Sequence, residues 1–429
     1  MTDIEIRAVI GILIVVHNRK EDLIRLLRSL DCQQYQVTEI LIIDNGSTDD
    51  LSEVQNLTSV EYLKLEENTG FVSGMVRGIR YLLSKNRYRY IWILDSDIEV
   101  SPTALNRLVA AFEEHKNVGL AGSVVWNKYA REIVVEAGAC VDLRSGVVTA
   151  RFCNERQPMM DPIMDVDFVG SGSGSLIRAD ALHTFGLHDE RYFFLWEDVD
   201  YGLCLKQNGL RSVVVADAAV FHPPFTEKRN PNIYAYYGVR NPLLTVAKYT
   251  NGLRLPLFLF GNLNRYLRIA LLMLFSGRRS FAQLTFRAIF DYIRGLFGNA
   301  ELMEIDQTAV PMVGADLSCE KRVVILGLGS ISAIKSAIDG VRRVNDIRIT
   351  LVIQSYRLAL LPQSGADDLI TYDDRYSNAL RGYLRTGVAI LRQGGCIINT
   401  DLQSVSPLCY FGWRTYDWDH AQRKFFHSR

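Results

Sequence analysis

Short runs of apolar residues alternate with amphipathic segments through the first half of this 429-residue chain, and no other feature constrains its fold as strongly. The runs are rich in isoleucine, leucine and valine, which predicts buried strands at 9–16, 40–43, 60–65 and 90–94. Apolar residues at helical spacing predict helices at 20–31 and 73–84. Strands and helices in this order form a parallel sheet with helices on both faces. The sequence therefore predicts an α/β fold with a mostly parallel central sheet, and we expect the alternation to continue to about residue 225.

Polar residues stand where three of these predicted strands end. Residues 44–49 follow the second strand, residues 67–70 follow the third, and Asp95-Ser96-Asp97 follows the fourth. In parallel α/β sheets, ligands bind outside the carboxyl ends of the strands. Mg²⁺ and Mn²⁺ prefer oxygen ligands and are commonly held by one or two carboxylates together with phosphate groups. The two aspartates therefore suit a divalent ion, although Asp-x-Asp also occurs by chance and often caps a helix.

A second group of acids, Glu197, Asp198 and Asp200, follows an aromatic run at 193–196. Apolar surroundings raise the pKa of a carboxylate toward the range that is useful to a general base. The same acids open a predicted helix at 197–208, where first-turn acids interact favourably with the helix dipole. A catalytic role and a structural role are therefore both compatible with this segment.

His222 ends a predicted strand at 218–222. A lone histidine at the end of a strand is usually not a ligand. Placed beside Asp97 in one cleft, it becomes a candidate third metal ligand through its neutral imidazole.

Charge and cysteine content exclude several classes of protein. The chain has 48 basic and 48 acidic residues, so there is no global electrostatic attraction to nucleic acid. Its seven cysteines are scattered without a Cys-x-x-Cys pair, which argues against a disulfide framework and a zinc site and favours a reducing cytosol. The apolar run at 8–16 is too short to span a bilayer and too β-branched for a signal peptide, so we expect no cleaved targeting segment.

Residues 250–300 combine strongly apolar runs with arginines. Asn262, Asn264, Arg265 and Arg268 interrupt the runs, so no span of about 20 apolar residues is present. Arginine-rich amphipathic helices of this kind can lie on an anionic membrane surface. The alternative is a pair of helices that packs on the preceding domain or at a dimer interface.

A second α/β unit begins at Lys321. Strands are expected at 323–326, 347–354, 368–371 and 396–399, and helices at 331–343 and 377–392, in a small Rossmann-like pattern. The turn at 327–330 matches a dinucleotide-binding fingerprint only in part, because Ser332 stands where the third glycine belongs and no acid ends the next strand. A structural or partner-binding domain is favoured over an NAD site.

Taken together, these motifs resemble the family-2 inverting glycosyltransferases of the GT-A fold. The chain is most similar to the bacterial galactofuranosyl- and rhamnosyltransferases of cell-surface polysaccharide synthesis. The resemblance covers roughly residues 8–245, and it is carried by residues 15–19, 44–49, 68–71, 77–79, 95–97, 196–198, 222 and 236–241.

The resemblance implies a role for each matching residue. The nucleotide sugar would be bound by Val15, Asp44, Asn68, Arg77, Asp95 and Ser96. Asp97 and His222 would hold Mn²⁺ or Mg²⁺, and Asp198 would be the catalytic base. The donor or acceptor sugar would contact Trp196, Glu197, Phe168 and Gly170.

Several features leave the sugar and the acceptor open. Met75 and Val76 occupy positions where the subgroup usually shows Asn, and Phe168 stands where Trp is common. The small residues of the predicted loop 167–175 permit close approach of the backbone to a sugar, or a mobile flap, and a plain connector is the competing interpretation.

We therefore expect a GT-A catalytic domain at 1–245, an amphipathic helical segment at 246–310 and a Rossmann-like domain at 320–429. The expected activity is metal-dependent, inverting transfer from a nucleoside diphosphate sugar to a hydroxyl of a lipid-linked or polysaccharide acceptor. UDP-galactofuranose is the favoured donor and dTDP-rhamnose the next. The expected location is the cytoplasm, at the inner face of the membrane, with no nucleic-acid partner and with a homo-oligomer left open.

Two other functions share features with this sequence. A non-catalytic scaffold would not need the acids at 95, 97, 197 and 198, which are all intact. A nucleotidyltransferase would normally carry a glycine-rich, basic phosphate loop after the first strand, and His17-Asn18-Arg19-Lys20 lacks glycine.

Overall fold

The computed structural model describes most of the first 300 residues and parts of the remainder. Described are residues 9–36, 39–55, 60–153, 155–223, 231–275, 279–300 and 302, then 322–326, 338–339, 341–342, 348–354, 366–372, 396–399, 415–419 and 424–427. The chain divides into two units. The first is Met1–Phe225, Asn232–Arg268 and Leu284–Met303, and the second is Thr226–Pro231, Ile269–Gln283 and Glu304–Arg429.

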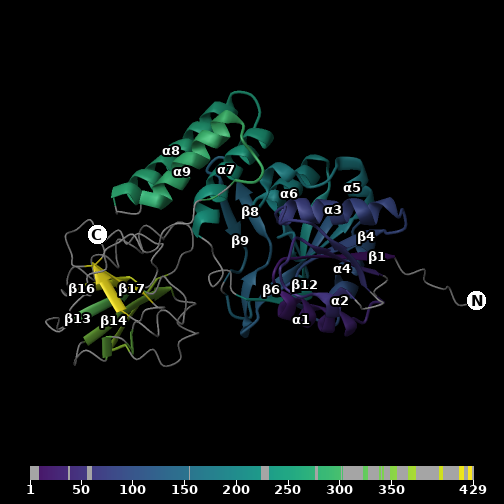
Figure 1. Ribbon diagram of the computed structural model, residues 1–429, viewed down its shortest axis with the longest axis horizontal. Coiled ribbons are helices and arrows are strands. Elements are labelled where there is room, and N and C mark those ends of the chain that lie inside the picture. Colours follow the sequence, from purple (N-terminus) through teal and green to yellow (C-terminus); the bar gives the residue numbers. More distant parts are fainter. Residues whose placement is uncertain are drawn as a thin grey trace, which may run out of the picture. The chain divides into compact units, whose positions relative to one another are not determined.

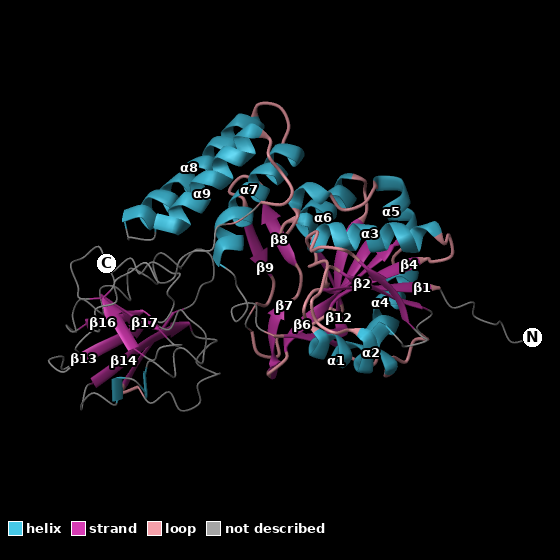
Figure 2. Ribbon diagram, in the orientation of Figure 1, coloured by secondary structure: helices cyan, strands magenta, loops and turns pink. Residues whose placement is uncertain are grey.

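The first unit combines strands and helices (Figures 1 and 2). They are β1 (Ile10–Val16), β2 (Glu39–Asp44), β3 (Val60–Lys64), β4 (Tyr90–Asp95), β5 (Glu99–Val100), β6 (Val118–Asn127), β7 (Ala130–Glu136), β8 (Ala139–Asp142), β9 (Val147–Ala150), β10 (Ile163–Val166), β11 (Ser173–Arg178) and β12 (Arg211–His222). The helices before residue 250 are α1 (Lys20–Asp31), α2 (Ser52–Gln55), α3 (Phe71–Ser84), α4 (Ala104–Glu114), α5 (Ala179–Phe185), the 3₁₀-helix η1 (Glu190–Tyr192), α6 (Glu197–Gln207) and α7 (Pro231–Tyr249).

The main sheet has the order β10-β12-β6-β11-β4-β1-β2-β3, with β5 paired to β12 and β7 to β6. β1 is parallel to β2 and to β4, β2 is parallel to β3, and β12 is parallel to β6. β11 is antiparallel to both β4 and β6, and β10 is antiparallel to β12. All strands of this row except β11 and β10 therefore run in one direction. The predicted fold class, α/β with a mostly parallel central sheet, is confirmed.

Side chains of the central strand β1 alternate between two hydrophobic cores, one on each face of the sheet. Ile10, Ile12 and Ile14 pack in the core that also contains the buried leucines of α1 and α4. Leu13 and Val15 pack in the core formed with α3, α5 and α6. Helices cover both faces, as Figure 2 shows, so strand residues of either parity are buried.

The predicted alternation of strands and helices is wrong between residues 118 and 178, where β6 to β11 follow one another without a helix. The predicted loop 167–175 is also wrong at its end, because Ser173 and Ser175 lie in β11 and are buried. Serine and glycine have low strand propensity, so the local sequence does not predict this strand. It is stabilised by pairing with β4 and β6.

Two longer helices, α8 (Arg254–Phe275) and α9 (Arg279–Arg294), follow α7. Among the described residues, no helix combines the length and the apolar character needed to cross a membrane.

The second unit contains a sheet of order β15-β14-β13-β16-β17-β18. Its strands are β13 (Arg322–Leu326), β14 (Arg348–Gln354), β15 (Asp368–Tyr372), β16 (Cys396–Asn399), β17 (Thr415–Asp419) and β18 (Lys424–His427). All neighbours are parallel except β17 and β18. The four strands predicted here are present, whereas the turn at 327–330, Ser332 and most of the two predicted helices lie outside the described residues.

His188, between α5 and η1, gives a test of this packing. Its buried ring stacks on Tyr201 with 4.3 Å between ring centroids, and burial lowers its pKa to about 3. Below pH 6.5 the unfolded chain binds a proton that the folded chain does not, so stability is lost toward pH 3 at about 1.4 kcal/mol per pH unit. We expect His188→Phe to keep the stacking and to flatten the fall of Tm between pH 7 and 5, measured by thermal melts. Parallel Tm–pH curves for the two proteins would contradict this.

Candidate active site

Asp95, Asp97 and His222 come together although 127 residues separate the first from the last. One ligand atom of each lies within 4.8 Å of the others. Asp95 ends β4 and His222 ends β12. The short β5, just after Asp97, pairs antiparallel with the end of β12, so that Glu99 lies opposite Phe221. This register brings His222 back beside Asp97.

Two cationic groups contact this acid pair. His222 Nε2 lies 3.3 Å from Asp97 Oδ1, and Arg19 Nη1 lies 3.0 Å from Asp97 Oδ2. Burial disfavours the imidazolium of His222, but its hydrogen bond to Asp97 and the charges of Asp97 and Asp95 raise its pKa overall. The site therefore already favours positive charge beside Asp97, and a divalent cation would supply more of it.

The donor set fits such an ion. His222 Nδ1 is hydrogen-bonded to the carbonyl oxygen of Pro223, and in the neutral ring this leaves Nε2 as the ligand atom on the side of Asp97. Two carboxylates and one imidazole suit Mn²⁺ or Mg²⁺ and leave coordination positions for other oxygens.

Asp198 lies at the start of α6, in electrostatic contact with Asp95. Burial is the main cause that raises the pKa of Asp198 to about 6, and the charge of Asp95 adds to it. Its Oδ1 accepts a hydrogen bond of 2.7 Å from the backbone N–H of Val199. A carboxylate with this pKa is poised to accept a proton near neutral pH.

Two further acids surround Asp198. Burial, then the charge of Asp198, raises the pKa of Glu197 well above its usual range, and Glu197 Oε2 is buried without a hydrogen-bond partner among the described residues. Glu136 ends β7, and burial followed by the charge of Asp198 raises its pKa to about 7. Glu136 is not among the residues predicted from the sequence, because no motif or periodicity distinguishes it.

The glycine-rich segment 170–172 packs directly against these acids. The carbonyl oxygen of Gly172 accepts a 2.7 Å hydrogen bond from the backbone N–H of Asp95, and the N–H of Gly170 bonds to Glu136. A Cβ on Gly172 would stand 1.9 Å from Asp95 Oδ1. The backbone of this segment therefore lies close to carboxylates of the protein, and its approach to a sugar stays a prediction.

The aromatic residues predicted to contact a sugar lie beside α6. Phe168 is 5% exposed and packs with Ala139, Val199 and Leu203, and the half-buried Trp196 lies against this cluster. Phe168 thus supports Trp196, and direct sugar contact by either ring stays a prediction.

The residues predicted to bind the nucleotide are distributed differently. Asp44 is fully buried, where it accepts hydrogen bonds from the N–H of Ser47, at 2.8 Å, and from the hydroxyl of Tyr62. Asn68 Oδ1 accepts the N–H of Gly70 at 2.9 Å. Both side chains therefore hold turns at the carboxyl ends of β2 and β3.

Four more residues were predicted to bind the nucleotide. Of these, Asp95 lies with Asp97 and His222 in the candidate cation site. Val15 and Ser96 are buried. Arg77 is exposed on α3, and within the part of the chain that is described it adds no contact to the acid cluster. Arg19, to which the sequence analysis gave no individual role, does contact the cluster through Asp97.

Replacing Gly172 tests whether its bare backbone positions Asp95. We expect Gly172→Ala to displace the Asp95 carboxylate and to weaken Mn²⁺ binding, measured by calorimetry with the metal alone. Gly261→Ala on α8 is the control, since the nearest atom to its added Cβ is 3.9 Å away. Equal Mn²⁺ affinity in both variants would contradict the assignment of Asp95 as a ligand.

Comparisons with known proteins show similarity to glycosyltransferases. Residues 11–181 match the family described as Glycosyl transferase family 2, a range that includes Asp95 and Asp97 and ends before Asp198. The galactofuranosyltransferase GlfT1 of Mycobacterium tuberculosis is 24% identical over 223 residues, which cover 51% of this chain and 71% of the relative. The N-acetylglucosaminyl-diphospho-decaprenol L-rhamnosyltransferase of the same species is 27% identical over 236 residues, which cover 50% and 76%. A solved structure of TarS from S. aureus with UDP-GlcNAc has 16% identity and a TM-score of 0.44, and covers 67% of this chain and 81% of that one.

Proposed function

We propose that this chain, which matches the family described as Glycosyl transferase family 2 over residues 11–181, moves a sugar from a nucleoside diphosphate donor to a hydroxyl group of a glycan or lipid-linked acceptor. The observation that carries the proposal is the gathering of Asp95, Asp97 and His222 beside Asp198. A cation site and a carboxylate base in one place are what this reaction needs, because a charged diphosphate departs while a hydroxyl loses its proton.

Asp95, Asp97 and His222 would hold Mn²⁺ or Mg²⁺. Bound there, the ion supplies Lewis-acid stabilisation of the negative charge on the departing nucleoside diphosphate. The carboxyl ends of β1 to β4, with Val15, Asp44, Asn68, Arg77 and Ser96 at or near them, are proposed to receive the nucleotide.

Asp198 is proposed to be the general base. It takes the proton of the acceptor hydroxyl as that oxygen bonds to the anomeric carbon, and the bond from this carbon to the diphosphate breaks in the same displacement. One displacement inverts the anomeric centre. Trp196 is proposed to pack against the sugar, with Glu197, Gly170 and Phe168 completing its surroundings.

The relatives support the choice of donor. One is named a galactofuranosyltransferase and another a rhamnosyltransferase of a diphospho-decaprenol acceptor. We therefore favour UDP-galactofuranose, with dTDP-rhamnose next. A screen that measures released nucleoside diphosphate with both donors and Mn²⁺ tests this, and no release from either donor would contradict the proposal.

Asp198→Asn isolates the base. We expect kcat to fall by about 10²–10⁴-fold, since the amide cannot accept the proton, while the affinity for UDP and Mn²⁺ is retained. In the unmodified protein kcat/KM should fall as pH drops through about 6, because protonated Asp198 is inactive. Steady-state kinetics and calorimetry measure both effects.

The control for this substitution is Asp161→Asn, which changes an exposed acid elsewhere. An Asp198→Asn protein with unchanged kcat would exclude a catalytic role for this residue.

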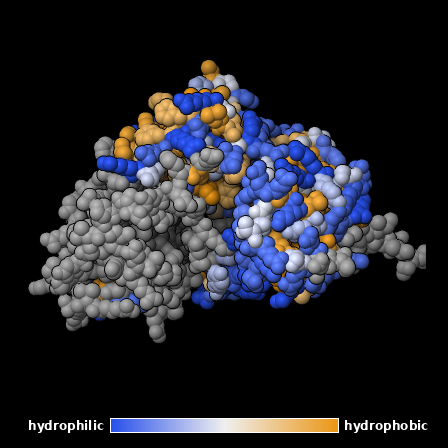
Figure 3. Space-filling model, in the orientation of Figure 1, coloured by the Kyte–Doolittle hydropathy of each residue, from blue (hydrophilic) through white to orange (hydrophobic). Residues whose placement is uncertain are grey.

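The helices α8 and α9 are proposed to contact the inner face of an anionic membrane, which would place the enzyme beside a lipid-linked acceptor. Residues 246–290 contain seven lysines and arginines and no aspartate or glutamate, in a chain of zero net charge. Large apolar side chains are exposed on these helices, as Figure 3 illustrates, namely Leu257, Phe260, Leu267, Leu271, Leu274, Phe290 and Ile293. Exposed apolar residues among arginines suit the boundary between acyl chains and anionic headgroups.

Vesicle sedimentation tests this contact. We expect binding to phosphatidylglycerol vesicles, weaker binding to phosphatidylcholine vesicles, and loss of binding in a Leu257→Ser, Phe260→Ser double variant. Met159→Ser is the control, since Met159 is 96% exposed and lies outside these helices. If the double variant instead breaks a dimer in sedimentation velocity and vesicles are never bound, the face is a homodimer interface and the membrane proposal is wrong.

A further inference from the structure

The backbone just before Asp198 adopts an unfavourable conformation. Phe193, Leu195 and Trp196 have φ angles of 60°, 65° and 74°, the left-handed region that non-glycine residues avoid. Each such residue costs of order 1–3 kcal/mol and persists only where its surroundings enforce it. We call residues 192–196 the strained turn.

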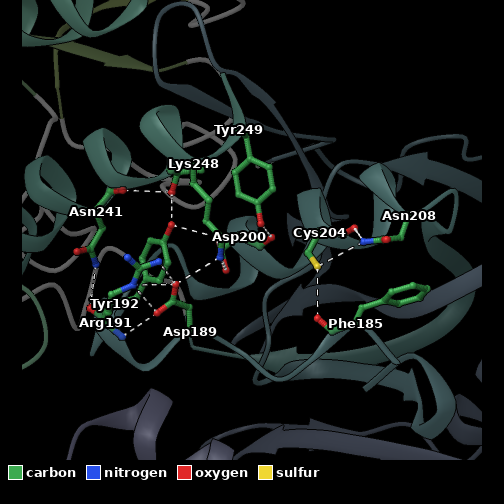
Figure 4. Close-up of polar contacts among 11 residues, drawn as sticks. Phe185, Asp189, Arg191, Tyr192, Asp200, Cys204, Asn208, Asn241, Lys248 and Tyr249 are labelled. Carbon is green, nitrogen blue, oxygen red and sulfur yellow. Dashed lines mark hydrogen bonds and ion pairs between the residues drawn. The ribbon is translucent and has the colours of Figure 1, made fainter. Parts of the chain in front are cut away.

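Asn241 of α7 binds this turn through its side-chain amide. Nδ2 donates to the carbonyl oxygens of Tyr192, Phe194 and Leu195, at 3.0, 2.9 and 2.8 Å. Asn241 is fully buried. Figure 4 shows the bond between Asn241 and Tyr192, the first residue of this turn.

Arg240, the preceding residue, holds the other side of the turn. Its Nη2 donates to the carbonyl oxygens of Arg191 and Tyr192 at 3.1 and 3.4 Å, and its Nε donates to Asn241 Oδ1 at 3.1 Å. The last bond orients the Asn241 amide so that its nitrogen faces the turn. Arg240 is 1% exposed, and its guanidinium lies over the rings of Tyr236 and Tyr237.

The helix that follows the turn is anchored to the same element. Asp200 on α6 pairs with Lys248 of α7 at 2.8 Å and accepts a 3.2 Å hydrogen bond from the hydroxyl of Tyr192 (Figure 4). The strained turn and the first turn of α6 are thus both fixed to α7, and Asp198 lies between these two anchors.

We propose that Arg240 and Asn241 are positioning residues. They hold the strained turn so that the Asp198 carboxylate and the Trp196 ring face the candidate cation site of Asp95, Asp97 and His222. This inference rests on the proposed function of Asp198. Neither residue touches the reacting atoms; they act through the backbone of residues 191–195. A segment that the sequence shows only as Tyr-Tyr-Gly-Val-Arg-Asn thereby gains a physical role.

The matched pair Asn241→Ala and Asn262→Ala tests the proposal. Asn262 on α8 is equally buried and donates to two backbone carbonyls, those of Arg144 and Phe258, away from the turn. With UDP-galactofuranose and Mn²⁺, we expect Asn241→Ala to lower kcat about 10- to 100-fold, as expected when a catalytic group is displaced. Its affinity for UDP with Mn²⁺ should remain within about twofold, and Asn262→Ala should lose thermal stability without a comparable loss of kcat.

The substitution Leu195→Gly, added to Asn241→Ala, distinguishes a positioning role of Asn241 from a general contribution to stability. Glycine adopts a positive φ without strain, so Leu195→Gly should restore part of the kcat lost in Asn241→Ala. A purely structural role for Asn241 predicts no such rescue.

Three outcomes would overturn the proposal: kcat of Asn241→Ala close to that of the unmodified protein, equal kcat losses in Asn241→Ala and Asn262→Ala, or no recovery of kcat when Leu195→Gly is added to Asn241→Ala. If the unmodified protein shows neither sugar transfer nor donor hydrolysis, the proposed function itself fails, which is a distinct result.

Discussion

The burial of neighbouring carboxylates is the constraint on which the rest of this structure depends. Five carboxylates, those of Asp95, Asp97, Glu136, Glu197 and Asp198, share one electrostatic neighbourhood. Burial makes each negative charge more costly than in water. The structure reduces this cost with two cationic groups on Asp97 and by raising the pKa of Glu136, Glu197 and Asp198. A divalent ion would lower this electrostatic cost further. The close spacing of the acids therefore supports the proposed cation.

Holding such acids together requires a rigid frame, and the central sheet provides it. Asp95 stands at the end of β4, a strand paired on both sides, by β1 and by β11. The antiparallel β11 begins directly after Gly172, whose missing side chain leaves room for the Asp95 carboxylate. The serines and glycines of this segment, which look like a flexible connector in sequence, therefore belong to the frame of the site.

The acids of α6 are held in a different way. They do not follow a strand directly but stand after the strained turn, in which Asn241 of α7 binds the carbonyl oxygens of Tyr192, Phe194 and Leu195. Stability is thus lost locally and recovered through contacts 40 to 50 residues further along the chain. In the proposed mechanism, this arrangement fixes the position of the base Asp198 relative to the metal ligands Asp95 and His222, which stand at the ends of strands of the sheet.

The sequence by itself determined the parallel half of the sheet, since β1 to β4 and the helices α1 and α3 follow from apolar periodicity that is strong within each segment. It also determined which residues could do chemistry, namely Asp95, Asp97, Asp198 and His222, because acids and a histidine at strand and helix ends are visible without coordinates. Tertiary structure alone decided that β11 enters the sheet, that β5 returns His222 to Asp97, and that Glu136, Arg19, Arg240 and Asn241 join the site or support it. These contacts join residues far apart in the chain, and their energies come from cross-strand pairing, burial and hydrogen bonds to backbone carbonyls. The conformational preferences of neighbouring residues do not include these energies, so the contacts could not be predicted from local sequence.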